Sequence, residues 1–138
     1  MIIADTNVVS EFMRDTPDPT VLTWAEGVDP TDLVICVVTV EEIERGLGRL
    51  PDGKRQRNLE QRWHQLVDAF KDTIAVYDVP GARATAQILV EAEAGGRPMA
   101  LADAQIAGIC VARGSTLATR NVRDFDRAAG LDVVNPFD

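Results

Sequence analysis

The stretch LADAQIAGICVARGSTLATRNVRDF, residues 101–125, decides the fold class because it joins a helical pattern to an apolar strand. The spacing of its apolar residues predicts a helix over 99–113 that ends at Gly114, a residue type common just after helices. The run STLAT, residues 115–119, predicts a buried strand, and polar residues follow it. A strand that directly follows a helix in this way is typical of α/β domains.

Asp103 is an unexpected charge within this helix. Its side of the helix also carries apolar or small residues, namely Met99, Ala100, Ile106, Ala107 and Cys110. The helix dipole stabilises a carboxylate in the first turn by roughly 0.3 to 1 kcal/mol, whereas an unpaired inward carboxylate costs several kcal/mol. Asp103 therefore requires a cation or hydrogen-bond donors, and it is the strongest functional candidate in the chain.

Alternating strands and helices account for the rest of the chain. Apolar runs at 2–5, 33–38, 74–79 and 131–134 predict strands in addition to 115–119. Helical patterns lie between these runs: after Asp5, from Asp18-Pro19, and over 39–49, 55–71 and 81–94. This order predicts a single domain, 1–138, with a three-layer α/β/α architecture and a mostly parallel sheet of about five strands.

Composition excludes several classes of protein. Hydrophobic residues make up 46% of the chain and no run approaches the length of a membrane helix, so a soluble, cytoplasmic protein is expected. Cys36 and Cys110 lie in apolar runs, where a free thiol is a small hydrophobic side chain. The one histidine, His64, lies in a polar helical segment and is expected at the surface, which leaves histidine-based metal sites and triads without ligands.

Polar residues follow several of the predicted strands and should meet at one sheet edge. Parallel strands end at a common edge, where α/β proteins bind ligands. This group comprises Asp5, Thr39, Glu42, Thr119, Asn121 and Asp124, with Asp103 in the first turn of its helix. Clustered carboxylates repel one another unless a cation lies among them, and an oxygen-only site suits Mg²⁺ or Mn²⁺.

Each of these residues also has a purely structural interpretation. Asp5 is a suitable N-cap for the helix that follows it. Thr39-x-x-Glu42 has the spacing of a capping box, in which the glutamate returns to the backbone of the threonine. Asp78, before Pro80, is interpreted as a helix cap, and Asn121 and Asp124 are equally suited to a turn.

A basic segment interrupts an otherwise acidic chain. The formal net charge is −8, yet residues 49–71 carry six Lys or Arg against three Asp or Glu. The residues in this segment that can contact a phosphate backbone are Lys54, Arg55, Arg57 and Arg62, and Arg120 and Arg123 lie beside the predicted edge. The alternative is a solvated helix face with no ligand.

Four segments together resemble a known family. These are MIIADTNVVSEFMR (1–14), VVTVEEIERGLGRL (37–50), residues 101–125 and VVNPFD (133–138). The ordered motifs DTN, T-x-x-E-x-x-x-G, A-D-A-x-I-A and A-T-R-N resemble PIN-domain ribonucleases, specifically VapC-type and FitB-like toxins of type II toxin–antitoxin pairs. The resemblance spans nearly the whole chain.

The resemblance implies a metal-dependent endoribonuclease. Asp5, Glu42 and Asp103 would hold Mg²⁺ or Mn²⁺, with Asp5 and Asp103 as the principal ligands. The family's fourth acidic position is Asn121 here, and Asp124 is the candidate substitute. Side chains expected to orient the carboxylates and water are Thr6, Asn7, Thr39 and Thr119. Residues expected to hold single-stranded or loop RNA are Lys54, Arg55, Arg57, Arg62, Arg120 and Arg123.

The resemblance also implies partners. These are a second copy in a homodimer, a VapB/FitA-like antitoxin whose tail covers the acidic groove, and operator DNA bound through the antitoxin. Membrane association is not expected. Two alternatives remain: a non-catalytic PIN-like module that binds RNA or protein, and an aspartyl-phosphate phosphatase of the haloacid dehalogenase type. The latter class has D-x-D at the first strand end, whereas this chain has Asp5-Thr6-Asn7.

Overall fold

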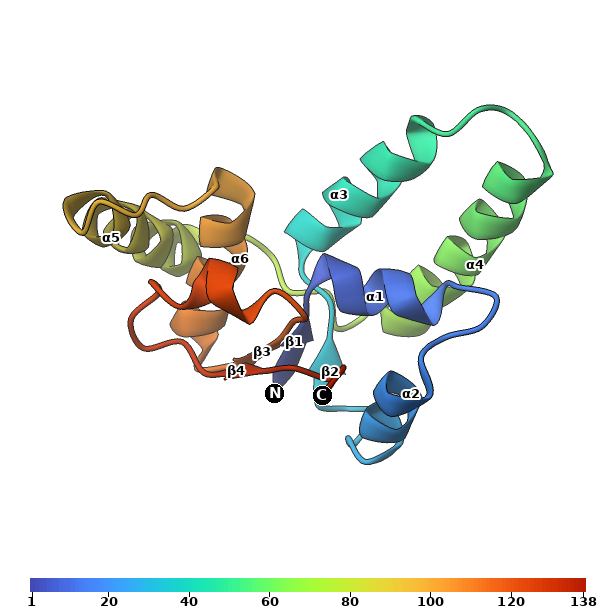
Figure 1. Ribbon diagram of the computed structural model, residues 1–138, viewed down its shortest axis with the longest axis horizontal. Helices are drawn as coiled ribbons and strands as arrows, with labels where there is room; N and C mark the ends of the chain where they lie inside the picture. Colours follow the sequence, from blue (N-terminus) through green and yellow to red (C-terminus); the bar gives the residue numbers. More distant parts are fainter.

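The computed structural model describes residues 1–138 as a small parallel sheet between two groups of helices (Figure 1). The strands are β1 (Ile2–Ala4), β2 (Leu33–Val34), β3 (Thr116–Ala118) and β4 (Val133–Val134). The helices are α1 (Thr6–Phe12), α2 (Pro19–Glu26), α3 (Val37–Gly48), α4 (Lys54–Phe70), α5 (Val79–Ala94) and α6 (Leu101–Arg113), with a short 3₁₀ helix, η1, at Val122–Phe125.

The sheet has the order β2-β1-β3-β4 and every pair is parallel. Ile3 of β1 is opposite Val34 of β2 on one side and Leu117 of β3 on the other. The chain thus leaves β1 towards β2 and later returns to the other side of β1. The crevice beyond the carboxyl ends of β1 and β3 is the switch point at which α/β sheets bind ligands.

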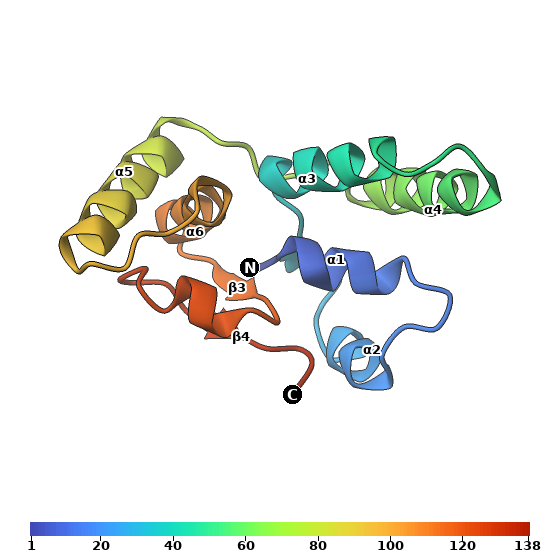
Figure 2. The same ribbon diagram turned by 45° about the horizontal axis from the view of Figure 1, so that its top comes forward.

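Neighbouring residues of each central strand face opposite layers. Ile3 and Leu117 belong to a core shared with α5, α6 and η1, whereas Ala4 and Ala118 belong to a second core shared with α1, α3 and α4. Figure 2 shows α5 and α6 on one side of the sheet and α1, α3 and α4 on the other. The predicted three-layer α/β/α architecture is confirmed.

The predicted fifth strand at 74–79 is wrong. Only Ala75 pairs with the sheet region, through a single bridge to Cys36. Val76 and Tyr77 are exposed, and Asp78 already caps α5 by accepting a hydrogen bond from the Gly81 amide at 3.0 Å. The apolar run therefore turns out of the sheet because the helix begins immediately after it, and four strands remain. The interpretation of Asp78 as a helix cap is confirmed.

Several local predictions hold. Asp18 caps α2 with Pro19 in the first turn, and Gly114 ends α6 in the left-handed conformation at φ 63°. Cys36 and Cys110 are free and buried, and His64 is exposed. No helix has both the length and the apolar character needed to cross a membrane.

Close packing against α5 fixes the position of α6. A Cβ added at Gly108 would lie 2.0 Å from Oγ1 of Thr85 and 2.8 Å from the carbonyl oxygen of Gly81, so only glycine allows this approach. Thr85 Oγ1 donates hydrogen bonds to the carbonyls of Gly81 at 2.8 Å and Ala104 at 3.3 Å. The first turn of α6, which carries Asp103, is thereby held beside the switch point.

Candidate active site

Asp5 lies at the centre of the candidate site, directly after β1. Its amide continues the sheet by donating to the Ala118 carbonyl at 2.8 Å, and its side chain caps α1 by accepting from the Thr6 amide at 2.8 Å. The cap interpretation is correct, but it uses one carboxylate oxygen only. The other oxygen accepts from Thr119 Oγ1 at 2.7 Å and from Asn7 Nδ2 at 3.1 Å.

These hydrogen bonds join three segments of the chain around a buried carboxylate. Asn7 Nδ2 also donates to Thr119 Oγ1 at 3.2 Å, and its side-chain oxygen accepts from the Arg120 amide at 3.0 Å. Burial raises the pKa of Asp5, its hydrogen bonds to Thr119 and Thr6 oppose that effect, and Glu42 adds to it. The predicted positions of Asn7 and Thr119 beside Asp5 agree with this geometry.

Glu42 does not form the capping box that its spacing allows. Helix α3 begins at Val37, with Cys36 as a cap that makes no side-chain hydrogen bond, so Thr39 is already inside the helix. Glu42 Oε1 instead accepts from Thr6 Oγ1 at 2.8 Å, and Thr6 Oγ1 lies 3.3 Å from the buried Thr39 Oγ1. Thr6 therefore links the second carboxylate to the first turn of α1, one residue after Asp5.

Asp103 faces the same site from α6 but is held differently. It is half-buried, and burial is the main reason that its pKa rises to about 6. The negative charges of Asp5, Asp124 and Glu42 raise it further, Arg127 lowers it, and no hydrogen bond contributes. Asp103 is thus an unpartnered carboxylate in a field of other carboxylates, which favours a cation at this point.

The two candidates for the fourth acidic position differ in their surroundings. Asp124, in η1, is close enough to Asp103 to raise its pKa. The Asn121 side chain makes no capping hydrogen bond; its amide donates to Thr119 Oγ1 at 3.1 Å and its carbonyl accepts from the Asp124 amide at 3.0 Å. Asp124 therefore supplies the negative charge on this side of the site.

The donor set suits a hard divalent cation that keeps much of its water. Four carboxylates lie near this edge, and two of them, Asp103 and Asp124, make no side-chain hydrogen bond or ion pair with the protein. No three Asp, Glu, His or Cys side chains lie close enough together to enclose an ion. Mg²⁺ is usually held by one or two carboxylates together with several waters. Asp5 and Asp103 suit this kind of site, whereas a closed cage would need more protein ligands.

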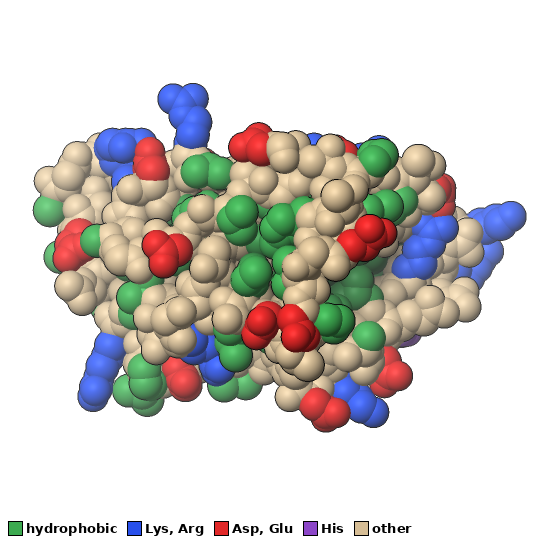
Figure 3. Space-filling view, turned by 90° about the horizontal axis from the view of Figure 1, so that it is seen from below, with side chains coloured by type: hydrophobic (Ala, Val, Ile, Leu, Met, Phe, Trp, Pro, Cys, Tyr) green, Lys and Arg blue, Asp and Glu red, His purple; other side chains and the backbone are tan.

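The predicted phosphate contacts fall into distinct environments. Lys54, Arg55 and Arg62 line an open cleft of about 600 Å³ between α4 and the segment 14–16, whereas Arg57 is exposed outside it. Arg120 lies over the ring of Phe137, 4.0 Å from its centroid, and Arg123 is exposed on η1. On the face drawn in Figure 3, Lys and Arg lie mainly towards the two ends of the molecule, while Asp and Glu occur across it.

Two residues near the site were missed by sequence reasoning. Arg127 follows η1, and its charge acts on Asp103. Arg14 lines both the basic cleft and a second cleft that reaches Glu42, although it lies in the quoted segment 1–14. The only available signal for Arg14 was its three-residue spacing from Glu11, which is also common in solvated helices.

The family model described as PIN domain matches residues 2–131. The chain belongs to the PIN-domain family. Among curated PIN-domain relatives, it is 37% identical to plasmid stability protein StbB of Pseudomonas syringae pv. tomato, and the alignment covers 100% of the chain and 99% of StbB. VapC ribonuclease Y4jK of Sinorhizobium fredii is 34% identical, with 100% and 99% covered.

Toxin FitB of Neisseria gonorrhoeae is a further PIN-domain relative, 35% identical with 99% of both chains covered. The crystal structure of FitAcB from that organism aligns with a TM-score of 0.91 at 34% identity over 99% of each chain. The structure of FitAB bound to a DNA fragment gives a TM-score of 0.91 at 33% identity, covering 100% of this chain and 96% of that one. The resemblance inferred from the motifs is confirmed.

Proposed function

We propose that this PIN-domain protein is a Mg²⁺- or Mn²⁺-dependent endoribonuclease and the toxin of a type II toxin–antitoxin pair. The observation that carries the proposal is at the β1/β3 switch point, where Asp103 has no partner of its own and lies near enough to Asp5, Glu42 and Asp124 for their charges to raise its pKa. The ribonuclease name of the relative Y4jK and the toxin name of FitB support it.

The residues of the chain have separate tasks in this proposal. Asp5 and Asp103 bind the cation, and Thr119, Asn7 and Thr6 fix the orientation of Asp5 and Glu42 through the hydrogen bonds described above. Glu42 orients the attacking water or accepts its proton. A bound divalent cation would polarise the scissile phosphodiester and stabilise negative charge on the leaving oxygen. The RNA backbone is held by Arg120 and Arg123 and by Lys54, Arg55 and Arg57 of α4.

The cellular role rests on the FitB-like relatives. FitAB is a complex that binds a DNA fragment. By analogy, we expect this chain to pair with a VapB/FitA-like antitoxin that binds operator DNA and extends a tail over the acidic site. An arginine of that tail would pair with Asp103, whose carboxylate has no other partner. A homodimer is part of the same expectation.

The decisive experiment is a cleavage assay on mixed RNA. Wild-type protein is expected to cleave single-stranded or loop regions with Mg²⁺ or Mn²⁺, to stop when EDTA removes the ion, and to recover when the ion is restored. Asp103→Asn is the matched inactive variant, since it removes the charge and keeps the shape. Equal cleavage by Asp103→Asn, or cleavage in EDTA, would show that the mechanism is wrong.

The two alternatives predict different results in the same assay. A non-catalytic binding module would retain labelled RNA without producing new ends. An aspartyl-phosphate phosphatase would carry a phosphoryl group on Asp5 after incubation with a phosphate ester, detectable by mass spectrometry. The sequence Asp5-Thr6-Asn7 disfavours the phosphatase, because that class has a second aspartate where this chain has Asn7, whose side-chain nitrogen donates to Asp5.

A further inference from the structure

A groove leads from the candidate active site to the basic cleft. A cleft of about 300 Å³ begins at Thr6 and Glu42 and runs between α1 and α3 to Arg14, Arg55 and Leu59. These last three residues also line the cleft of about 600 Å³ that contains Lys54 and Arg62. The two clefts therefore adjoin, with Arg14 and Arg55 between them. We refer to them together as the α1–α4 groove.

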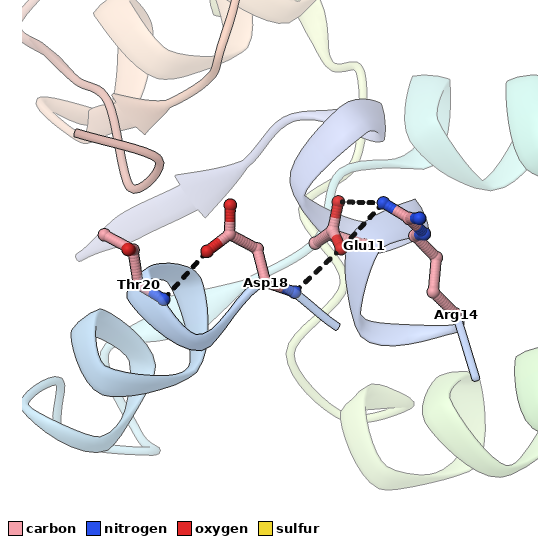
Figure 4. Close-up of polar contacts among 4 residues, drawn as sticks. All are labelled: Glu11, Arg14, Asp18 and Thr20. Atoms are coloured by element: carbon pink, nitrogen blue, oxygen red, sulfur yellow. Dashed lines mark hydrogen bonds and ion pairs between the residues drawn. The ribbon is translucent and has the colours of Figure 1, made fainter. Parts of the chain in front are cut away.

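A buried carboxylate holds Arg14 at this junction (Figure 4). Glu11 is only 4% exposed, and its two oxygens accept hydrogen bonds from Nη1 of Arg14 at 3.4 and 3.3 Å. Oε2 of Glu11 also accepts from the Asp18 amide at 3.0 Å, so the segment between α1 and α2 is closed around it. The Arg14 side chain remains 64% exposed, which leaves its other donors available.

The opposite wall of the groove is also braced. Arg62 of α4 donates to the Met13 carbonyl at 2.8 Å and pairs with Asp15, so it ties the segment after α1 to α4. Lys54 and Arg55 form no ion pair and face the cleft from the first turn of α4. Of the basic residues in the groove, Arg62 is thus occupied by the fold, whereas Arg14, Lys54 and Arg55 retain donors for a ligand.

We propose that the α1–α4 groove carries the RNA strand beyond the cleaved bond, and that Arg14, positioned by Glu11, contacts a phosphate of that strand together with Arg55. This rests on the proposed ribonuclease function and adds the path of the substrate. The basic rim matches a phosphate backbone, and the narrower cleft has an apolar floor formed by the nearly buried Met13, Ile43 and Leu47, against which an unpaired base can lie. Single strands expose both features at once, whereas a duplex hides its bases.

The test uses three RNAs: a short RNA with only the nucleotides around the cleaved bond, and the same RNA extended at its 5′ end or at its 3′ end. Wild-type protein should have a lower KM for one of the extended RNAs than for the short one. Arg14→Gln and Arg55→Gln should each reduce this KM advantage by about 5-fold or more and lower the salt dependence of binding by about one charge. Arg14→Lys should restore part of it.

Glu11→Gln separates positioning from folding. Gln keeps an acceptor for the Asp18 amide but loses the charge that holds Arg14, so the KM advantage should fall by about 2- to 3-fold with kcat unchanged. Arg83→Gln on α5 makes the same change in charge as Arg14→Gln but lies far from the groove, and it should keep the full advantage. Thermal unfolding of each variant shows whether a loss reflects folding, and Arg14→Gln, at an exposed side chain, keeps the test valid if Glu11→Gln unfolds.

The outcomes distinguish a failure of the groove proposal from a failure of the ribonuclease proposal. If wild-type protein cleaves none of the three RNAs, the ribonuclease proposal fails. If it cleaves them, and Arg14→Gln and Arg55→Gln retain the wild-type KM advantage, the groove proposal alone is overturned. It is also overturned if these variants weaken binding of the antitoxin tail without changing KM for any of the RNAs, because the groove would then be a protein-docking surface.

Discussion

Asp5 and Asp103 are carboxylates at the same sheet edge with opposite surroundings. Asp5 is 5% exposed and accepts three hydrogen bonds, from Thr6, Asn7 and Thr119. Asp103 is half-buried, accepts none and has a pKa of about 6. The fold is thus built around the first carboxylate, whereas the second is placed in the site at a cost to the fold.

This difference means that the two positions should respond differently to the same substitution. At Asp5, replacing the carboxylate with an amide keeps the helix cap but disrupts the hydrogen bonds that the other oxygen accepts from Asn7 and Thr119. At Asp103, removing it relieves repulsion from Asp5, Asp124 and Glu42. Both substitutions should abolish activity, but the one at Asp5 should lower stability and the one at Asp103 should raise it. This result would show that Asp5 serves both the fold and the site, whereas the charge of Asp103 serves the site alone.

Asp5→Asn is expected to have the largest effect. Its amide NH₂ would face Asn7 Nδ2, also a donor, so a buried hydrogen bond is lost while one negative charge is removed from the site. Cleavage should fall by more than about 100-fold, beyond the 10- to 100-fold typical of groups that only orient a metal ligand. Thermal or urea unfolding should show a loss of roughly 1 kcal/mol. Unchanged stability would mean that relief of the burial penalty, which raises the pKa of Asp5, offsets the lost hydrogen bond.

Asp103→Asn should abolish cleavage to a similar degree but stabilise the metal-free protein. The rise in pKa from 3.8 to about 6 corresponds to a penalty of at most about 3 kcal/mol at neutral pH, and partial exposure reduces the expected gain to about 1 kcal/mol. Because the folded state binds more protons than the unfolded state between about pH 4 and 6, this penalty is present above pH 6 and disappears as the pH falls.

Unfolding of wild type and Asp103→Asn in EDTA at several pH values measures the gap in unfolding free energy between the two proteins. It should be largest at pH 7 and close to zero at pH 4. Added Mg²⁺ should stabilise the wild-type protein more than the variant and should release a proton near pH 6 from the wild-type protein only. A gap that grows as the pH falls would contradict the assignment of the raised pKa to Asp103.

Sequence reasoning located these two carboxylates for different physical reasons. Asp5 ends an apolar strand, and strand ends of a parallel sheet meet, so its place follows from topology. Asp103 was identified because helical periodicity puts it among apolar side chains. Both arguments depend on one element and its neighbours along the chain, which is why they agree with the structure.

Features that depend on tertiary packing were not predictable in the same way. The pattern Thr39-x-x-Glu42 is the same for a capping box and for a site residue, and only the start of α3 at Val37 decides between them. The run 74–79 is apolar, yet the structure exposes Val76 and Val79 and leaves one bridge to the sheet. Glu11 is buried only because the segment up to Asp18 closes over it.

Thr119→Val tests how Asp5 is held and should have a smaller effect than loss of either carboxylate. The substitution keeps the shape of a fully buried side chain and removes the hydroxyl that donates to Asp5 at 2.7 Å and accepts from the Asn121 amide. Cleavage should fall by about 10-fold, as for other groups that orient a metal ligand. Thr119→Ser is the matched control and should retain most activity, whereas equal loss in both variants would indicate a packing defect.

The smallest effects are expected at the fourth acidic position. Asp124 acts on Asp103 through its charge, so Asp124→Asn should lower the pKa of Asp103 and reduce cleavage by only a few-fold.

Asn121→Asp adds a carboxylate beside Asp124 and should weaken binding of RNA slightly while leaving metal binding equal or tighter. Combining the two substitutions moves the charge three residues back. If the double variant cleaves as well as wild type while Asp124→Asn does not, the site needs a fourth negative charge, but this charge can stand at either position. If Asp124→Asn alone is fully active, the cation is held by Asp5 and Asp103 without help from η1.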